Sequence, residues 1–132
     1  MNFPIDNPVT NSLENTPLLS KLLEVSEYKE KYHEYLKEIA ENYFLNDAFK
    51  NIVSKLDSLI ENYIENDPTA FYTYDEYKDG LSNLIQFGID RTTSVLAQLD
   101  GTQSSTEYGT IKTSVNLEAM GTQNPSKINK FN

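Results

Sequence analysis

Residues 26–43, SEYKEKYHEYLKEIAENY, decide the fold class of this chain. Their large apolar side chains recur at steps of three and four residues, so they share one side of an α-helix. These residues are Tyr28, Tyr32, Tyr35, Leu36, Ile39 and Tyr43. Glutamates gather on nearly the opposite side. The stretch therefore predicts an amphipathic helix, capped by Ser26, that buries its tyrosines against neighbouring helices and leaves its acidic side in solvent.

Two other segments carry weaker helical signals. A short helix is predicted from Thr16, because Pro17 suits a first-turn position and leucines follow at helical spacing. Another helix is predicted to start at Asn46 or Asp47. It stops before Pro68, because proline disfavours helical geometry in the residue that precedes it.

The last predicted helix has the clearest boundaries. Thr73 and Glu76 have the spacing of a capping box, and Gly101 suits the left-handed position just past a helix end. Gly80 and Gly88 each weaken the helix interior by about 1 kcal/mol relative to alanine. We therefore expect another backbone to approach at least one of these glycines closely.

These signals together predict an all-α fold, a small antiparallel bundle of three to four helices with short connections. Residues 1–15 form an irregular, extended lead-in, and residues 16–101 form the helical bundle. Residues 102–132 form a polar tail that either lies over the bundle or is disordered, with a single helical turn at residues 117–120. At 132 residues the chain fits one domain.

Composition restricts the function classes. The chain has 20 acidic and 11 basic residues, and 18 acidic and 8 basic residues precede Gly101. Phosphate groups repel such a surface, so nucleic acid and anionic membranes are poor partners, whereas basic proteins or bound cations fit better. No cysteine is present for a disulfide, a thiolate zinc site or a nucleophile. The sequence also lacks a secretion signal and an apolar run that could span a bilayer.

A search for reactive motifs finds none. The glycines are too far apart to cradle a phosphate, and His33 is the only histidine, which excludes a histidine pair for zinc. We expect His33 to be an exposed or half-exposed helix residue. Residues 67–78, DPTAFYTYDEYK, have the length of a calcium loop, but Tyr72 stands where glycine is required and Lys78 where glutamate is required.

Three sets of residues are candidates for contact with a partner. They are the acidic residues Glu30, Glu34 and Glu38, the aromatic residues Phe71, Tyr72 and Tyr74, and Arg91. The glutamates form either a solvated face or a landing site for a basic partner. The aromatics either anchor a helix connection against the bundle end or form a docking patch on the surface. Arg91 either makes a structural ion pair with an acidic neighbour or contacts a neighbouring domain.

Four segments resemble the CotH family of spore coat proteins. They are residues 16–23 (TPLLSKLL), 27–35 (EYKEKYHEY), 66–71 (NDPTAF) and 91–101 (RTTSVLAQLDG). Their order and spacing look like the last third of that family's sequence, over a stretch from about Ile5 to Gly101. The shared order makes the resemblance more specific than any one segment.

The resemblance implies an atypical kinase-like fold that depends on ATP and a divalent metal and phosphorylates coat proteins during sporulation. Phosphoryl transfer needs a basic group at the phosphates, carboxylates that hold metal and a residue that orients the attacking hydroxyl. In the family those groups lie upstream of the part that this chain resembles. No segment here matches them, so we expect no catalytic, cofactor-binding or metal-binding residue in this chain.

We therefore expect a non-catalytic C-terminal helical region that supports the kinase-like lobe or docks coat proteins. Its partners would be the upstream kinase-like lobe or other coat proteins, and its location the spore coat or the cell surface. The alternative is a stand-alone helical interaction or scaffold module. An independent kinase is disfavoured, and the sequence leaves the oligomeric state open.

Overall fold

The computed structural model describes residues 1–10 and 12–116, and all regular structure in those residues is helical. The elements are the 3₁₀ turn η1 (Leu13–Asn15), α1 (Pro17–Glu24), α2 (Ser26–Ile39), the π-helical turn η2 (Ala40–Phe44), α3 (Ala48–Glu65) and α4 (Tyr74–Leu99). The predicted all-α fold is therefore confirmed. The helical turn predicted at residues 117–120 lies outside the described residues.

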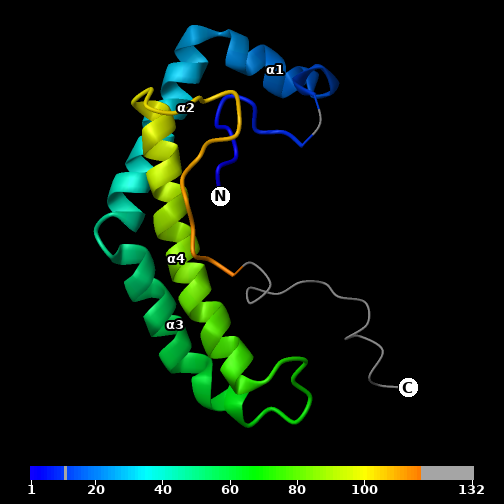
Figure 1. The fold of residues 1–132 in the computed structure, drawn as a ribbon, viewed down its shortest axis with the longest axis vertical. Helices are drawn as coiled ribbons and strands as arrows, with labels where there is room; N and C mark the ends of the chain where they lie inside the picture. Colours follow the sequence, from blue (N-terminus) through cyan, green and yellow to red (C-terminus); the bar gives the residue numbers. More distant parts are fainter. Residues whose placement is uncertain (11, 117–132) are drawn as a thin grey trace.

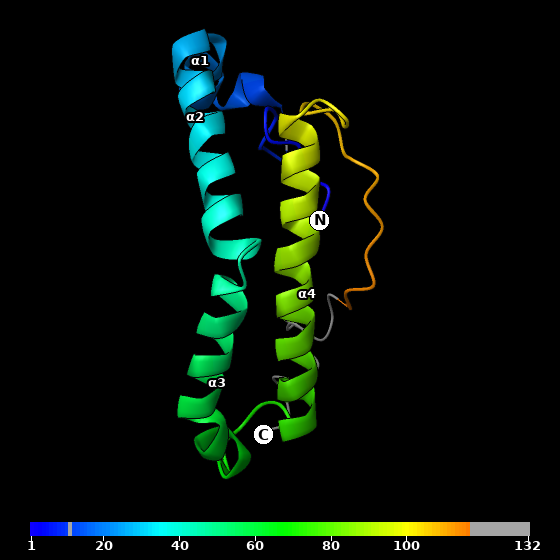
Figure 2. The ribbon, with the colours of Figure 1, turned by 90° about the vertical axis from the view of Figure 1, so that its left-hand side faces the viewer.

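The helices form an elongated, antiparallel arrangement. α2, η2 and α3 follow one another along a single rod, and α4 runs beside almost the whole length of that rod in the opposite direction (Figure 2). α1 turns away from the end of α2 (Figure 1). The described part of the polar tail, residues 102–116, runs back along α4 (Figures 1 and 2). None of the helices in the described ranges is both long enough and apolar enough to cross a membrane.

The boundaries of α4 follow the signals in the sequence. The Thr73 hydroxyl accepts a hydrogen bond from the Glu76 amide at 3.2 Å, and the Glu76 carboxylate accepts one from the Thr73 amide at 2.9 Å. Both halves of the capping box are thus present. Gly101 has a φ of 79°, the left-handed conformation expected after the helix end.

The other helix starts differ in detail. Val25, not Ser26, is the N-cap of α2, and no side chain caps that end. α3 follows Asp47, whose φ is 61°. Of the two residues that the sequence offered, Asp47 occupies the N-cap position without a side-chain cap, and the side-chain oxygen of the preceding Asn46 accepts a hydrogen bond from the Ala48 amide at 3.1 Å.

Gly88 allows the corner between η2 and α3 to approach α4. A Cβ atom at this buried position would lie 2.8 Å from the ring of Phe49 and 2.9 Å from the ring of Phe44. Those two rings contact each other with centroids 4.7 Å apart. The close approach predicted at a glycine of this helix is therefore present, but two aromatic side chains make it and not a backbone.

The N-terminal segment belongs to the core. Ile5 is 1% exposed, and the other buried apolar residues of the described chain are Ala40, Val53 and Val95. Residues 1–9 are irregular, as predicted, but they are not a mere lead-in. They occupy the space beside the upper part of α4, where α2 also passes (Figure 2).

Most of the tyrosine side of α2 remains exposed, contrary to expectation. Tyr28 and Tyr35 are each 54% exposed, Tyr43 is 52% exposed, and α2 contains no buried residue. The stripe is wider than one neighbouring helix can cover, and in the part of the chain that the structure describes α4 is the one long helix that runs beside α2 (Figure 2). Of the six tyrosine, leucine and isoleucine residues of this stripe, only Tyr32 and Leu36 reach half-burial.

Candidate docking groove between α3 and α4

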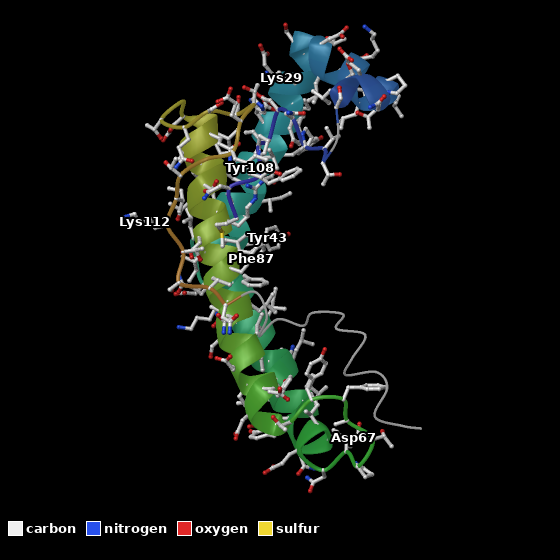
Figure 3. All side chains as sticks on the ribbon, turned by 45° about the vertical axis from the view of Figure 1, so that its right-hand side comes forward. Lys29, Tyr43, Asp67, Phe87, Tyr108 and Lys112 are labelled. Atoms are coloured by element: carbon white, nitrogen blue, oxygen red, sulfur yellow. The ribbon has the colours of Figure 1, made fainter. Side chains whose placement is uncertain are left out.

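An apolar groove of about 630 Å³ lies between α3 and α4, at the end where residues 66–73 connect them. Asp67 marks that connection at the lower end of the molecule (Figure 3). The lining residues are Val53, Leu56, Asp57, Ile60 and Ile64 from α3, Asp67, Thr69, Ala70, Phe71 and Tyr72 from the connection, and Glu76, Tyr77, Gly80, Leu81 and Leu84 from α4. Within residues 1–10 and 12–116, no lysine or arginine belongs to this lining.

The groove arises from two helical stripes that face each other without closing. Its α3 residues recur at three- and four-residue steps, and its α4 residues do the same in the antiparallel direction. Gly80 contributes no side chain to fill the space. Leu56 is therefore 54% exposed, Ile60 44% and Leu84 41%, although apolar stripes at helical spacing usually face a core.

The three aromatic residues predicted to form a patch at the connection differ in their exposure. Phe71 is 68% exposed and Tyr72 is 44% exposed, and both line the groove. Tyr74 is half-buried, and its hydroxyl donates a hydrogen bond to Glu61. Phe71 and Tyr72 thus lie where a surface patch would place them, whereas Tyr74 anchors the start of α4 to α3. Whether the exposed pair docks a partner remains a prediction.

Lys78 clamps the two helices at the edge of the groove. Its Nζ lies 2.9 Å from Oδ2 of Asp57 and 3.1 Å from Oε1 of Glu61, and the Tyr77 hydroxyl donates to Asp57 at 2.9 Å. The hydrogen bond from Lys78 lowers the pKa of Asp57, and that from Tyr74 lowers the pKa of Glu61. Burial, followed by the bond to Asp57, raises the pKa of Tyr77 to about 12.

Sequence reasoning missed this clamp. Its local signal is a pair of carboxylates four residues apart, Asp57 and Glu61, on the side of α3 that carries the apolar stripe. Because the stripe predicts that this side of α3 packs on a neighbouring helix, the basic partner of the two carboxylates is expected on that helix. The Tyr77–Lys78 dipeptide of α4 provides both a cation and a hydroxyl donor.

The end of the molecule that holds the groove is strongly acidic. Residues 57–79 contain seven aspartates and glutamates and a single lysine, which gives −6 of the formal net charge of −9. Lys78 is itself paired with two of those carboxylates. Asp67 accepts hydrogen bonds from the amide and the hydroxyl of Thr69, which lower its pKa and keep it ionised.

The predicted acidic residues of α2 lie outside the groove. Glu30, Glu34 and Glu38 are all exposed. Glu34 pairs with Lys31 on the same helix at 2.6 Å. The three carboxylates therefore form an acidic face of α2, and η2 and the first turn of α3 lie between α2 and the part of the rod that lines the groove (Figure 1).

Arg91, the remaining candidate, lies in α4 and contacts the N-terminal segment. Its guanidinium donates to the carbonyl oxygens of Phe3 at 2.6 Å and of Met1 at 2.9 Å. Among the described residues, Arg91 therefore bonds to main-chain carbonyls and not to the predicted acidic side chain, because the N-terminal segment packs against α4. Arg91 is half-buried and holds that segment, and a contact of its side chain with a neighbouring domain remains a prediction.

A buried carboxylate joins the N-terminal segment to α2. The side chain of Asp6 is 4% exposed, lies 2.7 Å from Nε2 of His33 and lies 2.9 Å from Nζ of Lys29. Burial opposes its ionisation, but hydrogen bonds from Ser105, Lys29 and His33 outweigh that effect and lower the pKa of Asp6. His33 is half-exposed, as predicted, and it serves this structural contact.

The described residues contain no group of three or more His, Cys, Asp or Glu side chains arranged to hold a metal ion. Comparison with protein families finds a match to the model described as CotH kinase protein over residues 1–95. The chain belongs to the CotH kinase protein family. The match includes the N-terminal segment that holds Asp6 and the helices that line the groove of this CotH protein. Neither the curated proteins nor the solved structures yielded a match.

Proposed function

We propose that this CotH protein is a non-catalytic helical region that packs against a kinase-like lobe in the spore coat, or docks other coat proteins there. The observation that carries the proposal is the amount of large apolar surface left in solvent. Among the described residues, eighteen large apolar or aromatic side chains are exposed and four apolar residues are buried. Exposed apolar surface of this extent marks contact sites with other proteins.

The most continuous part of this surface follows α2. Tyr28, Tyr35 and Ile39 are 54%, 54% and 48% exposed, and their spacing places them on one side of the helix. The acidic face of Glu30, Glu34 and Glu38 lies largely on another side. Tyrosines are enriched at protein interfaces, because an aromatic ring buries a large area with little loss of conformational freedom. We take this tyrosine stripe as the surface that a kinase-like lobe covers.

The positions of the basic residues support a non-catalytic role. Phosphoryl transfer requires a lysine or arginine at the phosphates and carboxylates that hold magnesium. Lys78 is paired with Asp57 and Glu61, and Arg91 is hydrogen-bonded to two main-chain carbonyls. Both groups are thus engaged in holding the helices and the N-terminal segment together.

Binding to a CotH kinase-like lobe from the same organism tests the proposal. We expect isothermal titration calorimetry to give a dissociation constant in the micromolar range or below. Tyr35→Glu should weaken this binding by about tenfold or more, because it places a charge in the tyrosine stripe. Glu34→Gln, one residue earlier on the acidic face, is the matched control and should change it less than about twofold. An affinity for the lobe that Tyr35→Glu leaves unchanged would contradict the proposal.

Nucleotide binding tests the non-catalytic part separately. We expect this chain alone to show no heat of binding with ATP and magnesium at concentrations up to the millimolar range. Micromolar ATP affinity would show that the chain holds a nucleotide site and would overturn the non-catalytic assignment.

A further inference from the structure

We propose that the groove between α3 and α4 binds a cationic amphipathic helix from a partner protein. The inference deepens the proposed function by naming the chemistry of one partner, and it rests on that function in taking this chain to act through protein contacts. It concerns a surface at the opposite end of the molecule from the tyrosine stripe of α2.

The dimensions of the groove favour a helix. On α3 the lining runs from Val53 to Ile64, a length of about 16 Å at the rise of an α-helix. A partner helix of about three turns spans that length and offers apolar anchors at i, i+3 or i+4, and i+7. The volume of about 630 Å³ accommodates several aliphatic side chains, and Leu56, Ile60 and Leu84 remain about half exposed to receive them.

The aromatic pair at the connection gives the groove an anchor at one end. Phe71 is the more exposed of the two at 68%, and Tyr72 lies beside it at 44%. Exposed phenylalanine in a free domain is unfavourable, because its ring gains on the order of 2 kcal/mol when it is removed from water. An apolar side chain of the partner that packs on the exposed part of the Phe71 ring would gain a share of this energy.

The negative charge around the groove favours a positively charged partner. Among the residues that the structure describes, the groove lining includes Asp57, Asp67 and Glu76 and no basic residue. Residues 57–79 carry a formal charge of −6, and the ion pairs of Lys78 already enter that sum. Lysines or arginines that flank the apolar stripe of a partner helix would meet this field, which steers association and disfavours acidic partners.

The same charge disfavours a second copy of the chain as occupant. Two grooves brought together would place two regions of charge −6 against each other, and like charges across an interface weaken association. Nucleic acid is disfavoured for the same reason. A cationic helix satisfies both the apolar lining and the charge.

A peptide titration tests the inference. The probe is a synthetic amphipathic peptide of about 14 residues, with leucines along one side and lysines beside them. Its control has the same composition in a shuffled order, so that the leucines no longer share a side. We expect micromolar binding of the amphipathic peptide by fluorescence anisotropy, binding of the shuffled peptide at least tenfold weaker, and an affinity that falls as salt rises. Equal binding of both peptides would show charge attraction without a groove and overturn the inference.

Two adjacent residues of α3 provide matched variants. Ile60 lines the groove, whereas Leu59 is 61% exposed and is not part of the lining. Ile60→Lys should weaken peptide binding at least tenfold, and Leu59→Lys, with the same change in charge, should weaken it less than about threefold. Gly80→Leu is a second groove variant that fills the space while raising helix propensity, and an unfolding midpoint at or above that of the wild type would show that its loss of binding does not come from unfolding. Unchanged binding in both groove variants would overturn the inference.

The lobe titration, run on the same variants, separates the two proposals. If the wild-type chain binds the lobe but does not bind the peptide, the inference is overturned and the proposed function stands. Peptide binding at the groove without any lobe binding would do the reverse. A dimer that Ile60→Lys dissociates, measured by light scattering, would assign the groove to a second copy and overturn the cationic occupant.

Discussion

Asp6 and His33 are 27 positions apart in the sequence, yet Oδ1 of the buried Asp6 lies 2.7 Å from Nε2 of His33. Lys29, one turn earlier on the same helix, reaches the other carboxylate oxygen at 2.9 Å. The Asp6 amide also donates to the carbonyl oxygen of Ser105 at 2.7 Å. One residue thus connects the N-terminal segment, α2 and the start of the tail.

Asp6→Asn should destabilise the fold by roughly 1–3 kcal/mol, because it removes a charged acceptor from buried and half-buried donors. The pKa of Asp6 is lowered from its ordinary value of 3.8, so its contribution is present above that value and is lost as pH falls through the folded-state pKa. Urea unfolding between pH 7 and pH 3 should therefore show a difference between wild type and variant that shrinks at low pH. A difference that is constant with pH would contradict the assigned role.

Tyr77 gives the opposite dependence. Its pKa is raised to about 12, so its contribution is complete below its ordinary value of 10 and is lost as pH rises toward the folded-state value. Tyr77→Phe should lower stability at pH 8 by about 0.5–1.5 kcal/mol, the usual value of one hydrogen bond. The difference from wild type should shrink from pH 10 upward in urea unfolding. A difference that grew with pH would show that Asp57 does not accept the Tyr77 proton in solution.

The helix boundaries were predictable because their causes are local. The capping box of Thr73 and Glu76, the block at Pro68 and the left-handed Gly101 all act within a few residues of themselves. The contacts that hold the N-terminal segment are of another kind. Arg91 and Phe3 are 88 positions apart, and neither residue type nor spacing reveals a hydrogen bond from a side chain to so distant a carbonyl.

The candidate groove could be predicted only in part. The apolar stripes of α3 and α4 were visible, and so was the aromatic cluster at Phe71 and Tyr72. Periodicity identifies the side of a helix that avoids water, but it does not tell how much of that side a neighbour covers. The exposure of Leu56 and Tyr35 depends on there being one long helix beside the rod of α2 and α3, which is a property of the whole arrangement.

The two glycines of α4 should respond oppositely to alanine. Gly88→Ala places a Cβ within 3.0 Å of the Phe44 and Phe49 rings, and both rings must shift because they also contact each other. We expect a net destabilisation of about 1–2 kcal/mol, since overpacking outweighs the gain in helix propensity. Gly80→Ala, in the open groove, should gain up to about 1 kcal/mol. The midpoint of urea unfolding measures both changes. If Gly88→Ala stabilised the protein, the Phe44 and Phe49 rings would pack less tightly against Gly88 in solution than in the structure.

Arg91 provides the test of how the N-terminal segment is held. Arg91→Met keeps the length of the side chain but removes the guanidinium donor of the Met1 and Phe3 carbonyls, leaving Phe3 only the 3.2 Å hydrogen bond from Gln98. The expected cost is roughly 1–3 kcal/mol, because hydrogen bonds to charged groups are the stronger kind. The Ile5 amide, which donates to Gln98 at 2.8 Å, should then exchange its hydrogen about tenfold faster or more, because the segment opens more often. Amides of α3 near Ile60 should keep their rates, since Ile60 lies toward the end where α3 connects to α4, whereas Arg91 lies toward the other end of α4. Faster exchange throughout the chain would instead mean that the segment and the helices unfold as one cooperative unit, and that Arg91 stabilises the whole fold.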